Sequence, residues 1–560
     1  MTEAHPCLVL GRHEVANAQW RTIEQEQGPA AAWQALMRGG HEAIRAALAG
    51  TRGEFALGIS DASGRTFLAV DHFAVRTLCY TVRDGRLHFA ERADALAPPD
   101  AELNPQALHD YVLLHAIASP DTVFAGIHRL PPGHCAWFED GRLDVGRYWT
   151  PAFKEMSSPS FDTLRDEFRQ LVQEAVARQL DGSKPACFLS GGTDSSTVAG
   201  MIGLATGVAA ASYSIGFDAQ GYDEMAFARL AAKRFGTEHH EYYVTPDDLV
   251  DGIPKVAAHH DQPFGNSSAL PAFYCALKAR EDGVTRLLAG DGGDELFGGN
   301  SRYAKQRVFG WYGGVPDALR RSILEPAFGT RWVSQTPLLK KGSSYIEQAR
   351  VPMPDRLQMY NLLRRLGAAQ VFTAALLNRV DQERTAEQQR AVWAEPGAVS
   401  EVNLMLAFDW RYTLAESDLP KVRSSTQLAG LSVGFPFLDD ALVDFSLRLP
   451  TPYKLKGLKL RWFFKEALRG FLPDEIISKR KQGFGLPFGV WVNRHDALKA
   501  LAVDSLNGLA SRGVVRPEFI RTLIGTHLPA YPGYYGEMVW ILMMLEQWLR
   551  SHAPAYRLLD

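Results

Sequence analysis

The chain has 560 residues, of which 46% are hydrophobic and 22% charged, a composition typical of globular proteins rather than of disordered or collagen-like chains. This length exceeds what one ordinary hydrophobic core accommodates, and it predicts two or three domains. Lys and Arg number 60 and Asp and Glu 63, so the formal net charge is −3. The chain therefore lacks the basic excess of dedicated nucleic-acid-binding proteins.

Cysteine usage and the apolar segments indicate where the protein resides. The five cysteines are scattered and form no CxxC pair, which favours a reducing compartment. The first twenty residues show no basic start followed by a long apolar stretch, so no secretory signal is predicted. The most apolar late stretch, 538–545, is too short to span a membrane. We expect a cytoplasmic protein with no membrane partner.

The N-terminal part of the chain has the pattern of a small α+β unit. Short apolar runs at 54–60, 66–70 and 87–90 are separated by turn sequences and predict β-hairpins. A segment rich in Pro and Ser follows at 151–160 and predicts a linker. We therefore expect one domain over residues 1–150 and a second over residues 151–560.

The second domain begins with a predicted amphipathic helix and continues with strands that alternate with helices. The strands are predicted at 186–189, 209–217 and 287–289, and the helices at 161–180, 195–204 and 223–235. Such alternation predicts a parallel sheet with helices on both faces. From about residue 300 onward the pattern is mostly helical.

A Gly-rich loop between a predicted strand and a predicted helix carries the strongest chemical signal. Residues 190–196 read SGGTDSS, and glycines at the start of a helix let backbone N–H groups cradle a phosphate. Ser190 and Ser195 add hydroxyl donors, whereas Asp194 suits a Mg²⁺ ion that bridges to phosphate. The loop has neither the Walker nor the GxGxxG spacing. The alternative is a structural turn in which Asp194 or Ser195 caps the helix.

A second Gly-rich loop lies about 100 residues later. Residues 288–299 place Asp291, Asp294 and Glu295 among five glycines, directly after a predicted strand. Acidic groups at the carboxyl end of a strand in an open α/β sheet are well placed for a metal site. The alternative is an acidic, solvated turn.

These loops carry a family resemblance. The first resembles the pyrophosphate-binding loop of ATP-pyrophosphatases, and alone it would also allow NAD synthetase, GMP synthetase, tRNA thiolation or argininosuccinate synthetase. Together the two loops resemble the synthetase domain of the asparagine synthetase superfamily. Residues 436–439 (PFLD) and 481–485 (KQGFG) resemble two further elements, and 127–134 and 147–149 resemble the stretch that joins the two domains.

The resemblance implies a two-domain α/β and α+β fold. The N-terminal domain would be a degenerate Ntn-type αββα glutaminase-like domain. The C-terminal domain would be a parallel-sheet ATP-pyrophosphatase domain, of the adenine nucleotide alpha hydrolase-like type, with a helical extension.

The resemblance also implies ATP and Mg²⁺ as cofactors and a role for each motif residue. Lys481 would be catalytic by neutralising the charge that develops as pyrophosphate leaves, although a solvated basic run is the alternative. Asp291 would act as a general base or orient the substrate. Asp194 and Asp294 would bind Mg²⁺. The ATP-binding residues would be Leu189, Ser190, Gly191, Gly192, Asp194, Ser195, Ser214, Ile215, Gly216 and Gly290.

The N-terminal region resembles a glutaminase scaffold without its chemistry. Glutamine-dependent members use a Cys that becomes N-terminal after Met removal, whereas Thr2 stands here and no glutamine-binding motif precedes residue 100. A propeptide that exposes Cys7 is an alternative. Loss of this activity is shared with β-lactam synthetase, carbapenam synthetase and lasso-peptide macrolactam synthetases. It implies that the nucleophile is an amine of the substrate itself.

We therefore expect an AMP-forming carbon–nitrogen ligase that adenylates a carboxylate and joins it to an amine. Because 412–423 and 429–435 are similar to lasso cyclases, macrolactam closure of a precursor peptide is the preferred reaction, with a leader peptidase and a leader-binding protein as partners. Amide formation on aspartate or another small acid is the runner-up. A silent ATP-binding scaffold and a tRNA-modifying enzyme are further alternatives.

Two departures from common patterns complete the sequence evidence. Most of the superfamily has an acid and an Arg where Ser432 and Gly434 stand, which favours an unusual substrate. The clusters at 238–241 and 259–261 contain His beside acids but lack zinc-site spacing, so we interpret them as structural.

Overall fold

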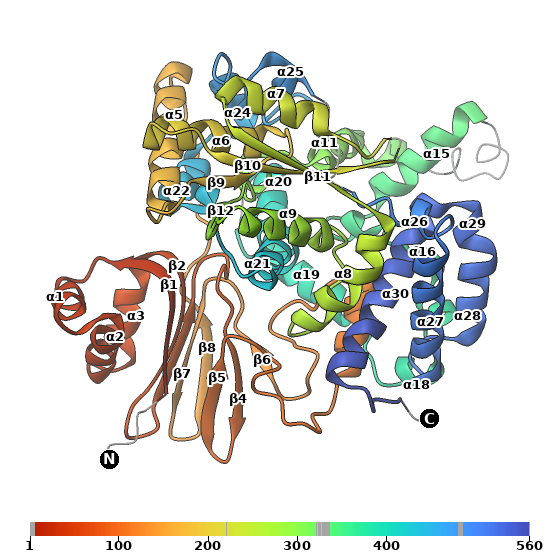
Figure 1. The fold of residues 1–560 in the computed structure, drawn as a ribbon, viewed down its shortest axis with the longest axis horizontal. Coiled ribbons are helices and arrows are strands. Elements are labelled where there is room, and N and C mark those ends of the chain that lie inside the picture. The colour runs from red at the N-terminus through yellow and green to blue at the C-terminus, as the bar shows by residue number, and fades with distance from the viewer. Residues whose placement is uncertain are drawn as a thin grey trace.

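The computed structural model describes residues 6–219, 221–320, 322, 326, 337–397, 399–479 and 485–558. The chain forms an N-terminal domain of helices and antiparallel sheets and a larger domain built on a parallel sheet (Figure 1). This is the two-domain α/β and α+β arrangement that the sequence predicts.

The N-terminal domain stacks a layer of helices on two sheets. Helices α1 (Ala18–Gln27), α2 (Pro29–Arg38) and α3 (His41–Ala49) precede most of the strands. The first sheet has the order β1-β2-β3-β7-β8, and the second β5-β4-β6. Their strands are β1 (Cys7–Val15), β2 (Thr51–Ser60), β3 (Thr66–Val70), β4 (Cys79–Arg83), β5 (Arg86–Ala90), β6 (His128–Arg129), β7 (His134–Glu139) and β8 (Arg142–Arg147).

Strand β3 shows why its sequence is apolar at every position. Phe67 and Ala69 pack against the helical layer, whereas Leu68 and Val70 pack between the two sheets. Because successive side chains of a strand point to opposite faces, a strand covered on both sides is hydrophobic throughout. The predicted hairpins at 54–60, 66–70 and 87–90 are confirmed as parts of β2, β3 and β5.

Beyond the second sheet, helix α4 (Pro105–Leu114) packs with helices of the C-terminal part of the chain. Its Tyr111 is fully buried, and the Tyr111 hydroxyl donates to the carbonyl of Ile541 at 2.9 Å. Ile541 lies in α30 (Pro532–His552), which contains the apolar stretch 538–545. This stretch is buried in the protein core, and none of the described helices is long and apolar enough to cross a membrane.

The larger domain is organised around a parallel sheet with the strand order β11-β10-β9-β12-β13. The strands are β9 (Ala186–Phe188), β10 (Ala211–Phe217), β11 (Glu238–Val244), β12 (Arg286–Leu288) and β13 (Ser432–Gly434). Strands β9, β10 and β12 lie where the sequence predicts them, whereas β11 and β13 were not predicted. The sequence of strand β11, EHHEYYV, is mostly polar. This fits its position at the edge of the sheet, where many side chains are exposed to solvent.

Helices cover both faces of this sheet, as predicted (Figure 1). Cys187 and Leu288 pack on one face in a core with α5 (Phe161–Gln179), α6 (Thr193–Thr206) and α7 (Met225–Phe235). Ala186 and Leu287 face the opposite core with α8 (Pro246–His259) and α9 (Ala269–Glu281). The predicted helices at 161–180, 195–204 and 223–235 are confirmed as α5, α6 and α7. The described residues after 300 are mostly helical, also as predicted.

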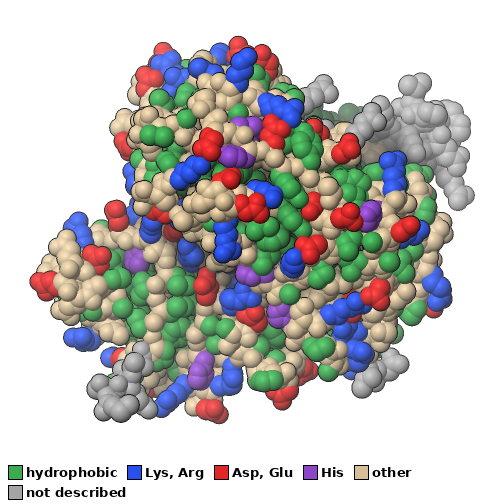
Figure 2. Space-filling view, in the orientation of Figure 1, with side chains coloured by type: hydrophobic (Ala, Val, Ile, Leu, Met, Phe, Trp, Pro, Cys, Tyr) green, Lys and Arg blue, Asp and Glu red, His purple; other side chains and the backbone are tan. Residues whose placement is uncertain are grey.

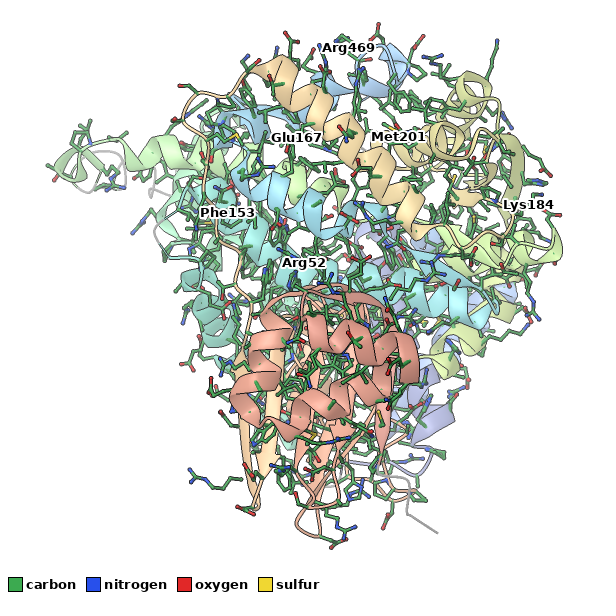
Figure 3. The ribbon with its side chains drawn as sticks, turned by 90° about the vertical axis from the view of Figure 1, so that its left-hand side faces the viewer. Arg52, Phe153, Glu167, Lys184, Met201 and Arg469 are labelled. Carbon is green, nitrogen blue, oxygen red and sulfur yellow. The ribbon has the colours of Figure 1, made fainter. Side chains whose placement is uncertain are left out.

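Charged contacts join the two domains. Arg52 lies at the seam between them (Figure 3), where its guanidinium is 3.6 Å from Asp440 and 3.3 Å from Asp444. A second contact between the domains is buried. In it, the Glu416 carboxylate pairs with the guanidinium groups of both Arg129 and Arg411. Elsewhere, positive and negative side chains are interspersed on the face shown in Figure 2.

The buried Glu416 cluster yields a stability prediction. Replacing Glu416 by Ala leaves Arg129 and Arg411 without their shared counter-ion, which should destabilise the fold by about 3–5 kcal/mol. Chemical denaturation measures this loss. The control is Glu518→Ala, which removes a surface carboxylate 3.1 Å from Arg521 and should leave the free energy of unfolding nearly unchanged. Equal effects of the two substitutions would contradict a structural role for the buried cluster.

Candidate active site

The strand order of the parallel sheet determines where a ligand can bind. From β9 the chain moves outward through β10 and β11 on one side, and β12 and β13 lie on the other. The order therefore reverses between β9 and β12. In open α/β sheets, ligands bind outside the carboxyl ends of the strands at such a reversal. The loops that follow β9 and β12 are the two Gly-rich loops that the sequence analysis selected.

A large cavity of about 1730 Å³ opens at this point. It is lined by both Gly-rich loops, by η3 (Trp410–Asp418) and α21 (Leu419–Leu428), and by the segments around residues 458–466 and 476–479. Ligand pockets commonly measure about 300–1,000 Å³. The cavity therefore has room for a nucleotide together with a second substrate.

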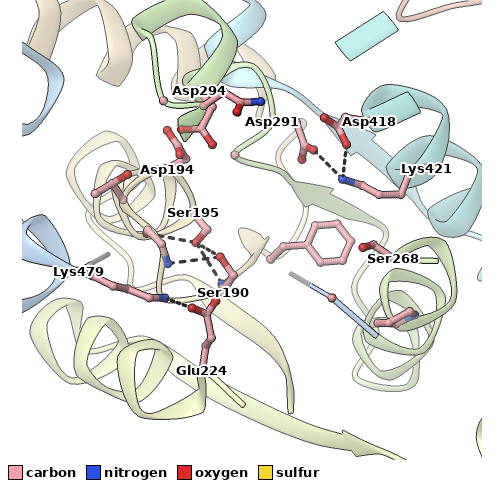
Figure 4. A pocket seen from close by; sticks show the side chains of 18 of the residues that line it. Ser190, Asp194, Ser195, Glu224, Ser268, Asp291, Asp294, Asp418, Lys421 and Lys479 are labelled. Carbon is pink, nitrogen blue, oxygen red and sulfur yellow. Dashed lines mark hydrogen bonds and ion pairs between the residues drawn. The ribbon is translucent and has the colours of Figure 1, made fainter. Parts of the chain in front are cut away.

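The loop after β9 has an open helix start. Helix α6 begins at Thr193, and no side chain caps it. The Ser195 hydroxyl accepts from the Ser190 backbone N–H at 3.1 Å and lies 3.0 Å from the Ser190 hydroxyl (Figure 4). Gly191 has a φ of +69°, and a Cβ there would collide with the backbone of α7 at Ala228. These features form a rigid anion cradle at the helix N-terminus.

The two aspartates assigned to Mg²⁺ converge on one cationic group. Nη1 of Arg461 lies 2.6 Å from Asp194 Oδ2 and 2.7 Å from Asp294 Oδ1. Burial alone would lower the pKa of Arg461, but Asp194 and Asp294 raise it above its ordinary value. Arg461 itself has a φ of +52°, an uncommon backbone conformation for a residue with a side chain. The local structure therefore holds one positive charge between both carboxylates.

The donor set at this position fits a magnesium ion. Mg²⁺ is commonly held by one or two carboxylates together with substrate phosphates. Asp194 and Asp294 supply the carboxylates, and the phosphate loop is adjacent. A Cβ at Gly293 would overlap the Asp194 carboxylate, and one at Gly299 would overlap that of Asp294, so both glycines are needed for this approach.

A second charged cluster lies on the side of the cavity formed by α21. The Lys421 ammonium is 3.3 Å from Asp291 and 3.0 Å from Asp418 (Figure 4). Burial raises the pKa of Asp291, and Lys421 opposes that shift. Burial would lower the pKa of Lys421, but Asp418 and Asp291 raise it above its ordinary value. Asp291 thus faces the cavity as a carboxylate whose basicity depends on one lysine.

The structure brings most of the predicted site residues together in this cavity. Asp291 and Asp294 line it, as do Leu189, Ser190, Gly192, Asp194, Ser195, Ser214, Ile215 and Gly290. Gly191 and Gly216 do not line it. Gly191 lies against α7, and a Cβ at Gly216 would be 2.6 Å from the Tyr243 ring, so both allow close packing behind the cavity.

Lys481 and its neighbours Gln482, Gly483 and Phe484 lie outside the described residues. Lys479, two residues before Lys481, lines the cavity and pairs with Glu224 at 2.7 Å (Figure 4). The role assigned to Lys481 therefore stays a prediction.

Three charged residues that lie around the predicted site aspartates were among those assigned no role from the sequence. Arg461, Lys421 and Asp418 all line it, and each contacts a predicted site aspartate or its partner lysine. Lys421 and Asp418 fall in the segment 412–423, which resembles lasso cyclases. This resemblance was the only indication from the sequence that the two residues belong to the site. Arg461 lies more than 150 residues from either aspartate loop, and no local motif marks it.

The structure corrects the expectation drawn from Ser432 and Gly434. We expected the departure at these positions to alter the substrate contacts. Neither residue lines the large cavity. Both belong to β13, where Ser432 borders a small separate cavity and a Cβ at Gly434 would lie 2.7 Å from Nη2 of Arg286.

The histidine clusters remain outside the site. The His240 imidazole lies on β11, 3.1 Å from Glu238 and 3.2 Å from Asp282. Among the residues that the structure describes, no group of three or more His, Cys, Asp or Glu side chains is arranged to hold a metal ion.

Comparisons with known proteins match both parts of the chain. The Asparagine synthase family matches residues 167–550, and a Glutamine amidotransferase domain matches residues 33–149. Two asparagine synthetases [glutamine-hydrolyzing] of Bacillus subtilis, numbered 1 and 3, are 25% and 26% identical over 76% and 75% of this chain. A Gibberella zeae protein named amidase is 23% identical over 79% of this chain and 70% of its own.

The alignments cover part of the length of the Bacillus relatives. They span 66% and 64% of the two Bacillus proteins, so this chain covers just under two thirds of their length. The solved structure of the allosteric regulatory enzyme of purine biosynthesis matches 38% of this chain and 46% of that chain, at 14% identity and a TM-score of 0.17.

The close approach at Gly293 yields a binding prediction. In Gly293→Ala the new methyl group pushes against the Asp194 carboxylate, so the affinity for MgATP should fall at least tenfold, or about 1.4 kcal/mol. Isothermal titration calorimetry measures this change. The matched control is Gly203→Ala on α6, where the methyl meets no atom within 4 Å. This control should bind MgATP normally and gain roughly 0.5–1 kcal/mol of stability.

Proposed function

Because the chain belongs to the asparagine synthase family of ATP-dependent carbon–nitrogen ligases, we propose that it activates a carboxylate with ATP and joins it to an amine carried by the substrate. The observation that carries this proposal is the convergence of Asp194 and Asp294 beside the phosphate loop, in a cavity that also contains Asp291 and Lys421.

The first half of the reaction would take place at the phosphate loop. The loop and Ser190 and Ser195 would hold the ATP phosphates, so that a substrate carboxylate oxygen attacks the α-phosphorus. The bond to the β-phosphate oxygen breaks, and the products are an acyl-adenylate and pyrophosphate. Mg²⁺ held by Asp194 and Asp294 would supply positive charge next to the phosphates. Arg461, which pairs with both aspartates, would have to share or release them when the ion and nucleotide bind.

The second half would take place near Asp291. The amine nitrogen attacks the acyl carbon, the bond to the AMP oxygen breaks, and AMP leaves. Asp291 would accept the proton that the amine loses, because its buried carboxylate has a raised pKa. Lys421, which Asp418 also contacts, would position Asp291 and favour its ionised form, whereas the neighbouring charge of Asp418 raises the pKa of Asp291. If Lys481 reaches this cavity, its charge would stabilise the leaving pyrophosphate.

The thiols of the N-terminal domain support a substrate amine rather than ammonia released from glutamine. Cys79 and Cys135 are buried, and burial raises the pKa of both, that of Cys135 to about 11. Burial also raises the pKa of the Cys7 thiol. Reactive cysteines have lowered pKa values, so none of these three has the character of a nucleophile. We therefore propose that the amidotransferase-like domain serves as a scaffold.

We further propose that the carboxylate and the amine belong to one peptide, so that the product is a macrolactam of the lasso type. The size of the cavity supports this choice, because it exceeds the space that ATP and a small amino acid need. A leader peptidase and a leader-binding protein would then prepare the substrate. The second candidate is amide formation on aspartate or another small acid, which the names of the Bacillus relatives favour.

The metal assignment has a direct test. Asp194→Ala and Asp294→Ala should each reduce AMP formation at least a hundredfold, because each removes half of the proposed carboxylate pair. AMP released from MgATP and substrate is quantified by chromatography. Asp251→Ala, which removes an exposed carboxylate 2.6 Å from Lys255 on α8, serves as the matched control and should be fully active. Persistent turnover in both site variants would contradict the metal assignment and would indicate another site for ATP, whereas no AMP formation in the unmodified protein would favour the silent scaffold.

The choice of substrate is tested with MgATP and two substrate sets. Peptides with a free N-terminal amine and an internal Asp or Glu should lose the mass of one water and yield stoichiometric AMP. Aspartate with excess ammonium should yield no asparagine. Asparagine formed with stoichiometric AMP would overturn the peptide proposal in favour of the small acid. AMP release that depends on added tRNA would instead indicate RNA modification.

A further inference from the structure

A second cavity lies at the junction between the two domains. Its volume is about 140 Å³, and roughly 10–15 Å³ suffices for one water molecule, so it can hold a small ion with some water. Glu54 and Arg76 line it from the N-terminal domain, and Arg423, Gln427 and Ser432 line it from the larger domain. The proposed reaction makes no use of this cavity.

Both arginines have a buried donor without a hydrogen bond. These donors are Nε of Arg76 and Nη1 of Arg423. Arg423 donates from Nη2 to the Thr77 hydroxyl at 3.1 Å, but its Nη1 is 3.5 Å from Glu91, beyond ordinary hydrogen-bond distance. Buried polar groups in folded proteins are nearly always hydrogen-bonded. Two orphaned guanidinium donors at one cavity therefore indicate an acceptor that binds there.

The charges around the cavity indicate what kind of acceptor this is. Burial lowers the pKa of Arg423; the acids Glu91 and Asp261 raise it, whereas the neighbouring charges of Arg76 and Arg129 lower it further. Glu54 is the acidic residue among those that line the cavity, and it lies 3.9 Å from Nη2 of Arg76. In the part of the chain that the structure describes, Nε of Arg76 has no hydrogen-bond partner. An additional anion would satisfy both donors and reduce the repulsion between the two arginines.

We propose that this cavity binds a small oxyanion, a carboxylate or inorganic phosphate, between Nε of Arg76 and Nη1 of Arg423. The planar fork of arginine matches the spacing of carboxylate and phosphate oxygens. Access is from the side of Gln427, whose side chain borders the cavity and is exposed to solvent. The bound anion would connect the domains, because one arginine comes from each.

The site is also connected to the large cavity. Arg423 belongs to α21, the helix that presents Lys421 to Asp291 two residues earlier. An anion at the junction therefore fixes the helix on which the Asp291–Lys421 pair depends. Binding itself is independent of the proposed reaction and can be measured without turnover.

The experiment compares thermal unfolding of the full chain in sodium phosphate, sodium acetate and sodium chloride at equal ionic strength. Saturating phosphate or acetate should raise Tm by roughly 2 °C above chloride. Acetate alone would identify a carboxylate site, and phosphate alone a phosphate site. No shift with either anion would show that the cavity holds only water and would overturn the proposal.

Two variants in the cavity make the test specific. Ser432→Asp places a carboxylate inside the cavity and should abolish the shift, whereas Glu54→Gln removes the competing acid and should enlarge it. Because phosphate can also bind at the loop after β9, Ser195→Ala is the matched control and should retain the acetate-induced shift. A shift that survives in Ser432→Asp but disappears in Ser195→Ala would assign the anion to the large cavity and contradict the junction site.

Discussion

The convergence of two carboxylates on one cation at the reversal of the sheet is the constraint on which the site depends. Asp194 follows β9 and Asp294 follows β12, and the two loops meet because these strands are neighbours. Two aspartates this close repel each other unless a positive charge lies between them. Arg461 provides that charge in the structure, and the glycines at 293 and 299 remove the side chains that would block the approach. The geometry of the phosphate site therefore depends on charge compensation as much as on the loops.

This dependence gives the segment around Arg461 a function in the cycle that we propose. While no ion is bound, the guanidinium offsets the repulsion between Asp194 and Asp294 and keeps the two loops in register. When MgATP enters, Mg²⁺ and the Arg461 guanidinium would both face the carboxylates of Asp194 and Asp294. The ATP phosphates would then supply anionic partners for the displaced guanidinium. Arg461 is buried, so its movement would be small and would couple the occupancy of the nucleotide site to the segment that follows it.

The sequence predicts those parts of the site that are local in the chain. The function of the loops at 190–196 and 288–299 can be predicted from their glycines and acids, because each loop is contiguous in sequence and follows an apolar strand. Lys421 and Arg461 could not be predicted in this way, since their roles arise only when a helix and a distant turn fold onto those loops. Strand β11 was missed for a related reason, because its polar residues follow the exposure of an edge strand and not an alternating pattern. Ser432 and Gly434 show the reverse error, in which a departure in sequence was assigned to the substrate although the fold places it on β13.

The relation between the domains follows from the same reasoning about charge. Cys79 and Cys135 of the N-terminal domain are buried, and burial raises the pKa of both thiols, so we propose that this domain retains the architecture of an amidotransferase without using these thiols as nucleophiles. It nevertheless remains tightly joined to the larger domain, through Glu416 between Arg129 and Arg411 and through α4, which packs beside α30. Arg411 and Glu416 lie in η3, which ends at Asp418 next to the cavity, and α21 continues directly from it. The domain that we propose to be a scaffold therefore holds in place the helices that carry Asp418 and Lys421, which gives a structural reason to keep it without glutaminase activity.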